Sequence, residues 1–248
     1  MSKFNLYEDD EIRDLMGENL RPGGLKLTKD AVEFCQLKPK AKLLDIGCGI
    51  GNSIAYLEKN YDVDVIGIDP SEKLLNIARN NHPKLEFIKA SAENLPFKSE
   101  EFHMVLTECS LSLVEDIKKG LKEITRVLKE DGYLIINDVY AKENTYLKEL
   151  KKIPINTCMR SLHDIDELRF ILENYGFNIV LFKDYSQYLK ELMVKIIFKY
   201  GSMSVFWSEN INNCMDINEF QEMFKKSKPG YFTMIAKRGK GNNGRNIL

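Results

Sequence analysis

The 248-residue chain contains little of several things that would assign it to a specialised class of protein. Its five cysteines include no C-x-x-C pair, so neither a disulfide framework nor a structural zinc site is expected. Its three histidines, His82, His103 and His163, show no metal-ligand spacing, and we predict no catalytic metal. Reduced cysteines make a cytoplasmic location the default expectation.

Charge and hydropathy exclude further classes. Lys and Arg number 36 against 37 Asp and Glu, a net charge of −1, so no basic field draws the chain to nucleic acid or anionic lipid. The longest apolar stretch, 192–200, is short and is interrupted by Lys195 and Lys199, so it cannot span a bilayer. The acidic residues at 8–11 differ from the basic start of a signal peptide. We therefore expect no membrane or nucleic-acid partner.

What the chain does contain is a glycine-rich segment at 42–52, KLLDIGCGIGN. An apolar strand leads to Asp45, and three glycines follow on alternate positions: Gly47, Gly49 and Gly51. Glycine lets the backbone approach a ligand where a Cβ would clash. The helix that follows directs free N–H groups and a partial positive charge at the same place. The segment predicts a nucleotide-like cofactor site at the carboxyl end of a parallel strand.

The spacing of the glycines argues against a dinucleotide. A dinucleotide fingerprint reads G-x-G-x-x-G, whereas here Asn52 takes the place of the third glycine. A second apolar run, 63–69, ends at Asp69, roughly 20 residues past the glycines, where an acid reaches ribose hydroxyls. A carboxylate can accept hydrogen bonds from both hydroxyls at once, which explains the residue type.

These motifs resemble those of class I S-adenosylmethionine-dependent methyltransferases of the type 11 kind. The segment 90–97, ASAENLPF, is similar to the D-A-E-x-L-P-F segment of that family, with Ser91 in place of the usual aspartate beside adenine. The resemblance covers roughly residues 43–138. It implies S-adenosyl-L-methionine as cofactor, with the glycines beside its methionine part, Asp45 serving its cationic end and Asp69 its sugar. We assign to the cofactor site Gly24, Asp45, Gly47, Cys48, Gly49, Gly51, Asp69, Pro70, Ser71, Ser91, Ala92, Glu93, Thr107 and Glu108.

The resemblance also implies the fold. We expect an α/β, Rossmann-like, doubly wound sheet of seven strands, mostly parallel with the last strand antiparallel, and a helical insertion between strands six and seven. Further strands are predicted at 85–88, 102–109, 133–138, 177–183 and 231–237, with Asp116 and Asp164 as helix N-caps. A single domain is predicted over 1–248, with an N-terminal helical segment (1–38), a core (39–183), an insertion (184–229), a last strand (230–238) and a flexible tail (239–248).

The N-terminal segment is expected to fold over the cofactor. Residues 21–24, RPGG, predict a turn whose two glycines lie in the pocket, and Thr28 is a predicted cap for a helix at 29–35. Arg21 has two interpretations, a contact to the cofactor's carboxylate or a solvated turn residue, and we favour the second. Three tyrosines are conceivable pocket residues: Tyr7, Tyr140 and Tyr146.

The acceptor is less well defined, because a sulfonium methyl is already electrophilic and no general base is compulsory. Cys109 and Cys158, with the segments 108–113 and 137–140, resemble arsenite methyltransferases, whose thiolates hold trivalent arsenic. The other interpretation is that both are small buried hydrophobes. We predict methyl transfer to a small molecule by a monomer or homodimer. A thiol-directed methyltransferase using these cysteines, a nicotinamide oxidoreductase and a non-catalytic cofactor-binding module are the alternatives.

An apolar segment in the predicted insertion has two interpretations as well. Its large side chains are Leu189, Met193, Phe198, Phe206 and Trp207. They can form a lid over an apolar acceptor, or they can be core or dimer contacts, which their helical spacing favours.

Overall fold

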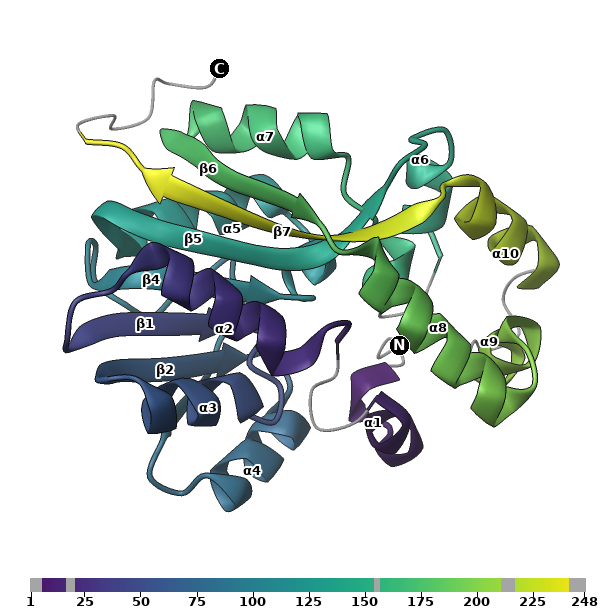
Figure 1. The fold of residues 1–248 in the computed structure, drawn as a ribbon, viewed down its shortest axis with the longest axis horizontal. Helices are drawn as coiled ribbons and strands as arrows, with labels where there is room; N and C mark the ends of the chain where they lie inside the picture. The colour runs from purple at the N-terminus through teal and green to yellow at the C-terminus, as the bar shows by residue number, and fades with distance from the viewer. Residues whose placement is uncertain (1–5, 17–20, 154–156, 211–216, 241–248) are drawn as a thin grey trace.

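The computed structural model describes residues 6–16, 21–153, 157–210 and 217–240. Seven strands form one sheet of order β3-β2-β1-β4-β5-β7-β6 (Figure 1). Neighbouring strands from β1 to β5 are parallel, whereas β7 is antiparallel to both β5 and β6. The predicted doubly wound fold is therefore confirmed. The strands are β1 (Ala41–Ile46), β2 (Val63–Asp69), β3 (Glu86–Lys89), β4 (Phe102–Glu108), β5 (Leu128–Ala141), β6 (Phe177–Asp184) and β7 (Pro229–Arg238).

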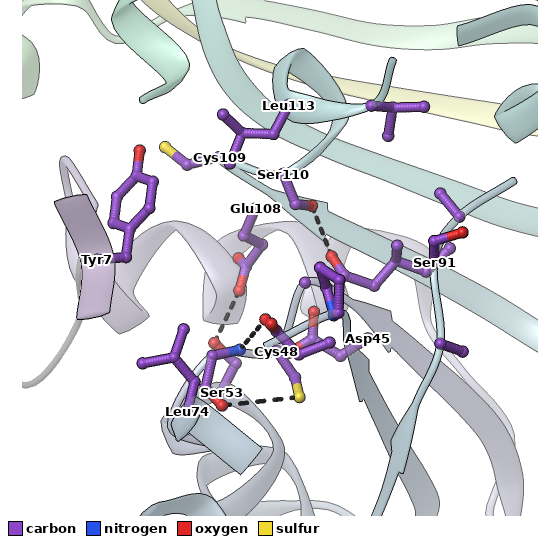
Figure 2. Close-up of a pocket in the computed structure, with 18 of the residues that line it drawn as sticks. Tyr7, Asp45, Cys48, Ser53, Leu74, Ser91, Glu108, Cys109, Ser110 and Leu113 are labelled. Atoms are coloured by element: carbon purple, nitrogen blue, oxygen red, sulfur yellow. Dashed lines mark hydrogen bonds between the residues drawn. The ribbon is translucent and has the colours of Figure 1, made fainter. Parts of the chain in front are cut away.

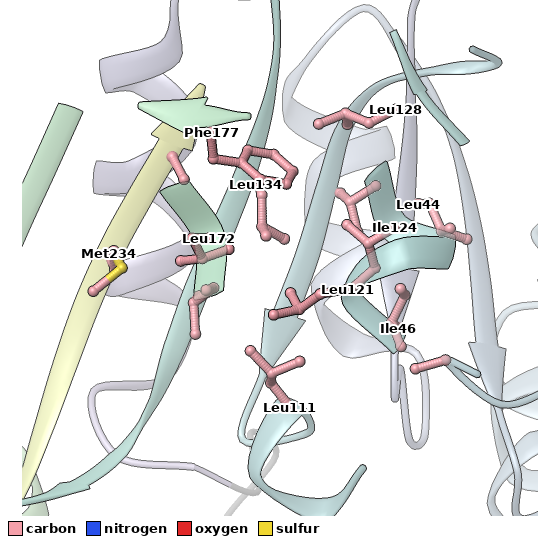
Figure 3. Close-up of a cluster of buried hydrophobic side chains, with 14 of the residues drawn as sticks. Leu44, Ile46, Leu111, Leu121, Ile124, Leu128, Leu134, Leu172, Phe177 and Met234 are labelled. Atoms are coloured by element: carbon pink, nitrogen blue, oxygen red, sulfur yellow. The ribbon is translucent and has the colours of Figure 1, made fainter. Parts of the chain in front are cut away.

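The central strands are apolar almost throughout because helices cover both faces of the sheet. On one face lie α2 (Gly24–Cys35), α3 (Asn52–Asn60) and α4 (Glu72–Asn81), and on the other lie α5 (Ile117–Val127) and α7 (Ile165–Asn174). Figure 3 shows the second layer, where Leu121 of α5 and Leu172 of α7 pack with Leu44 and Leu134 of the sheet.

Two predicted caps explain where the helices of this second face begin. The Asp116 side chain accepts from the Lys119 N–H at 3.0 Å, and Asp164 accepts from the N–H groups of Asp166 and Glu167. Each carboxylate satisfies donors that the first turn of a helix leaves unpaired. Both caps were predicted from the sequence and are confirmed.

A third core lies beyond the carboxyl end of β5, as Figure 1 shows on the right. It joins α1 (Asp10–Met16) and α6 (Leu147–Lys151) to α8 (Ser186–Tyr200), α9 (Met203–Asn210) and α10 (Ile217–Lys226). The last three helices form the predicted insertion between β6 and β7. Leu189, Phe206 and Trp207 are buried in this core, which confirms the core interpretation, whereas Phe198 is 86% exposed.

Some predicted boundaries are wrong. Helix α2 begins at Gly24 after Gly23, whose φ of +75° lies in the left-handed region that glycine adopts readily, so Thr28 lies inside the helix and is not its cap. Strand β5 extends past the predicted 133–138 at both ends. Most of the predicted flexible tail, 241–248, and Cys214 lie outside the described residues. In the ranges that are described, no helix combines the length and apolarity needed to cross a bilayer.

Candidate active site

A cavity of about 670 Å³ opens at the carboxyl ends of the central strands (Figure 2). The order of the strands reverses here, since β1 lies between β2 and β4, and this is where open α/β sheets bind ligands. Most of the predicted cofactor residues line it, namely Asp45, Gly47, Cys48, Gly49, Asp69, Pro70, Ser91, Ala92, Glu93 and Glu108, together with Cys109.

The glycine-rich bend after β1 shapes the floor of the cavity. Gly49 has a φ of +55°, and a Cβ built on it meets nothing within 4 Å, so its missing side chain leaves open space. Gly51, with a φ of +84°, sits at the N-cap of α3, where a Cβ would come within 2.7 Å of the Phe87 ring. Gly51 does not line the cavity, and its missing side chain allows the backbone to turn into the helix.

Asp45 contributes an unsatisfied carboxylate oxygen to this floor. Its side chain is 2% exposed, and its Oδ1 has no hydrogen-bond partner in the described part of the chain. Burial raises the pKa of Asp45 well above its usual range, the Glu108 carboxylate raises it further and the Arg21 guanidinium lowers it. A buried oxygen without a donor is costly, so this position suits a ligand that brings a donor or a positive charge.

Asp69 closes β2 on the other side of the bend. Its Oδ2 accepts from the Gly49 N–H at 3.0 Å and its Oδ1 from the Ser71 N–H at 2.8 Å. Burial raises the pKa of Asp69, and these two donors lower it. Each carboxylate oxygen has a second lone pair, so Asp69 can hold the bend in place and still accept hydrogen bonds from a ligand.

Arg21 is buried, which corrects the favoured interpretation of a solvated turn residue. Its Nη2 lies 2.9 Å from Glu108 Oε2, with side-chain exposures of 8% and 4%. The Glu108 carboxylate also accepts from Thr28 Oγ1 at 2.9 Å, Ser53 Oγ at 2.8 Å and Asn137 Nδ2 at 2.9 Å. A buried charge needs such a partner and such hydrogen bonds. The N-terminal turn is thereby fastened to the ends of β4 and β5.

Several other predicted site residues do not line the cavity: Gly24, Ser71, Thr107 and Cys158. The hydroxyl of Ser71 caps α4, accepting from Leu74 N–H, and donates to Glu8. Thr107 points into the sheet and donates to the Ile135 carbonyl at 3.3 Å. Gly24 starts α2, and its neighbour Gly23 does not line the cavity either.

The cavity also has walls that the motifs did not indicate. The segment after β4 supplies Ser110 and Leu113, the latter in the short helix η2 (Leu111–Leu113), and Lys119 lines it from α5. Figure 2 shows Ser110 and Leu113 above the bend. No glycine pattern or charge offset points to these side chains. The position of Ser110 and Leu113 directly after a central strand is the signal that could have indicated them, because strand ends meet at this edge.

The two predicted cysteines lie next to each other at the end of the cavity formed by Tyr7. Tyr7, in the short helix η1 (Leu6–Glu8), lines the cavity, whereas Tyr140 and Tyr146 do not. Its hydroxyl accepts from the Cys158 N–H at 3.2 Å. A hydrogen bond with the Cys158 thiol, followed by burial, raises the pKa of Cys109 well above its usual value. A thiol held protonated favours the buried-hydrophobe interpretation over a thiolate ligand.

Comparison with known proteins agrees with this geometry. A family model described as "Methyltransferase domain" matches residues 44–136. Phosphoethanolamine N-methyltransferase 3 of Arabidopsis thaliana is 30% identical over 175 residues, 68% of this chain and 36% of that protein. The ubiquinone/menaquinone biosynthesis C-methyltransferase UbiE of Campylobacter jejuni is 31% identical over 179 residues, 60% of this chain and 76% of that protein.

A solved structure shows the same fold. Phosphoethanolamine N-methyltransferase 2 of Haemonchus contortus, in complex with S-adenosyl-L-methionine, matches with a TM-score of 0.69 and 18% identity over 95% of this chain and 57% of that one. The chain thus spans only part of the length of the Arabidopsis and Haemonchus proteins. It belongs to the methyltransferases, and within them to the class I S-adenosylmethionine-dependent family, whose cofactor is S-adenosyl-L-methionine.

Proposed function

We propose that this chain binds S-adenosyl-L-methionine in the 670 Å³ cavity and transfers its methyl group to a small-molecule acceptor. The unpaired, buried Oδ1 of Asp45 carries the proposal, because the cofactor's ammonium group brings the donor that this oxygen lacks. Asp69 would accept from the sugar hydroxyls, the open space at Gly49 would admit the methionine part, and Ser91 would lie beside the base.

The cofactor supplies a methyl group that its sulfonium already makes electrophilic. The chain itself has to position the acceptor and to enclose the reacting atoms. Arg21 and Glu108 form a rigid buried wall, since five of their polar contacts tie α2, α3, β4 and β5 together. Tyr7, Leu74 and Leu113 add apolar cover that keeps water away from the reacting atoms. Holding an acceptor in line at such a site can supply most of the barrier reduction without a general base.

The atom that is methylated does not follow from the relatives. Their names give nitrogen for the Arabidopsis protein and carbon for the Campylobacter protein. A thiol-directed reaction at Cys109 and Cys158 is disfavoured by the raised pKa of Cys109. A non-catalytic module would bind the cofactor but never release S-adenosylhomocysteine, so turnover separates it from an enzyme.

Two measurements test the proposal. Calorimetric titration with S-adenosylhomocysteine should show binding to the unaltered protein and to Asp64→Asn, an exposed position on β2, and much weaker binding to Asp45→Asn. Release of S-adenosylhomocysteine is then followed with a panel of amines, phenols, carbon acids and arsenite with a thiol. Equal binding by both variants would remove Asp45 from the site. No release with any acceptor would leave the non-catalytic module.

A further inference from the structure

A second, small cavity of about 20 Å³ adjoins the Tyr7 end of the main one, the end where we place the acceptor and which we call the acceptor end. Tyr7 and Cys109 line both cavities, so these two side chains form the partition between them. The far walls are apolar side chains of the insertion helices and β5, among them Leu189, Leu192, Ile196, Phe206, Trp207 and Val139. A space of this size takes about one small group, and an apolar lining leaves it unfavourable for water.

The charges around the main cavity are distributed unevenly. Only two of the described residues that line it are basic, Arg21 and Lys119. Lys119 lies on the Ser91 side of the cavity. It is in the first turn of α5, which Asp116 caps, and the preceding residue Glu115 donates its N–H to Glu93 at 3.0 Å, two residues after Ser91. Figure 2 places Tyr7 and Ser91 on opposite sides of the cavity.

Of these two cations, Arg21 is therefore the one nearer the Tyr7 end, and it already forms an ion pair with Glu108. Its guanidinium contacts Glu108, Thr28, Ser53 and the Gly24 carbonyl. An anion placed here would have to compete with a buried carboxylate for the same guanidinium. An unpaired anion taken out of water is strongly disfavoured.

We infer that the acceptor carries no anionic group such as a phosphate, and that its apolar extension reaches past Tyr7 and Cys109 toward Leu192. This inference rests on the proposed methyl transfer and narrows its substrate class. Because Arg21 is already paired with Glu108, the Tyr7 end offers an anion only a cation that has a carboxylate partner, and the adjoining apolar space gives an alkyl group a place to be buried. The acceptor in the name of the Arabidopsis relative, phosphoethanolamine, is a phosphate ester and does not match this end of the cavity.

Matched pairs of probes test separately the exclusion of an anion and the binding of an alkyl group in the small cavity. Protein loaded with S-adenosylhomocysteine is titrated with 4-methyl-, 4-ethyl- and 4-propylphenol and with the corresponding phenyl phosphates. The phenols should bind at least about tenfold more tightly than their phosphates, because only the phosphates bring a charge without a partner. Adding methylene groups should strengthen binding by up to roughly fourfold each until the small space is filled.

Cavity variants show where the alkyl group lies. Leu192→Ala enlarges the small cavity, so the propyl member should gain affinity relative to the methyl member. Leu168→Ala is the control, since Leu168 is a buried leucine of α7 in the core on the other face of the sheet, and it should leave that ratio unchanged. Ile196→Val makes the same test with a smaller change if Leu192→Ala does not fold, which melting curves reveal.

Each outcome decides the inference. The inference is overturned if the phosphates bind as tightly as the phenols. It is also overturned if the ratio of the affinities for the propyl and methyl members is the same in Leu192→Ala and Leu168→Ala. Loading with S-adenosylhomocysteine but no binding of any phenol overturns it while leaving the proposed function in place. Failure to load at all overturns the proposed function itself.

Discussion

The part of the cavity that we propose for the cofactor and the part that we propose for the acceptor, here called the cofactor half and the acceptor half, are built in different ways. The cofactor half comes from the ends of two adjacent parallel strands and the loop between them, with Asp45 paired in register to Gly67 and Asp69 following on the same strand. The acceptor half joins Tyr7, Arg21 and Cys109, and behind them Cys158 and Tyr231. A site made by one short segment can be read from sequence, whereas a site assembled from distant segments depends on the whole fold.

The two halves meet at Glu108, and removing its side chain should have the largest effect. Glu108→Ala leaves the Arg21 guanidinium buried without its partner and should lower the free energy of unfolding by about 3–5 kcal/mol. Glu72→Ala is the control, because Glu72 pairs with Arg79 on the surface and should cost no more than about 1 kcal/mol. Urea denaturation measures both. Equal losses would mean that the halves are not joined through this ion pair.

A change confined to the cofactor half should act on binding. Asp69→Ala removes the proposed acceptor of the sugar hydroxyls and the anchor for Gly49 and Ser71. We expect a roughly 10- to 100-fold weaker affinity for S-adenosylhomocysteine, since hydrogen bonds to a charged group contribute about 1.5–3 kcal/mol. Asp64→Ala, on the same strand but exposed, should bind normally in calorimetric titrations. Unchanged affinity in Asp69→Ala would place the sugar elsewhere.

The protonation of Asp45 should make cofactor binding depend on pH. Its folded-state pKa is raised, so its contribution to stability is present at low pH and is lost as the pH rises through the folded-state pKa. A bound ammonium group favours the ionised form. Binding of S-adenosylhomocysteine below the raised pKa should therefore release up to about one proton, and the affinity should rise as the pH increases toward the raised folded-state pKa of Asp45.

Calorimetry in buffers of different ionisation enthalpy counts this proton. Asp45→Asn cannot release it and serves as the control. Binding that neither releases a proton nor strengthens with pH would show that the ammonium group does not approach Asp45.

The smallest effect is expected from the cysteines of the acceptor half. Cys109→Ala and Cys158→Ala should each keep the affinity for S-adenosylhomocysteine within roughly threefold and cost about 1 kcal/mol of stability, as buried small hydrophobes do. Binding assays and melting curves check this. If both variants fold, bind the cofactor analogue and yet lose turnover of an arsenical acceptor, the thiol-directed alternative gains the support that it now lacks.

The same contrast explains what the sequence could predict. Strands β1 and β2, the bend between them and both acids follow from apolar runs, glycine spacing and the offset to Asp69, which are local signals. The caps at Asp116 and Asp164 are local as well. These predictions depend only on neighbours along the chain, and the structure has the strands and the caps at the expected positions.

The remaining features depend on partners far away in the sequence. From its local sequence Arg21 resembles a solvated turn residue. Only the packing of α2 against the sheet brings it next to Glu108 of β4. Thr28 resembles a cap by type but lies inside the longer helix and donates to the same carboxylate. The juxtaposition of Cys109 with Cys158 likewise arises only when the segment after β5 folds back over the strand ends.

A crystal structure with bound S-adenosylhomocysteine tests most directly whether the bend after β1 is the cofactor site. We predict the sugar hydroxyls within hydrogen-bond distance of Asp69, the ammonium group facing Oδ1 of Asp45, and the methionine part crossing the open space at Gly49. A ligand bound outside this cavity, or bound inside it with both acids uncontacted, would contradict the assignment.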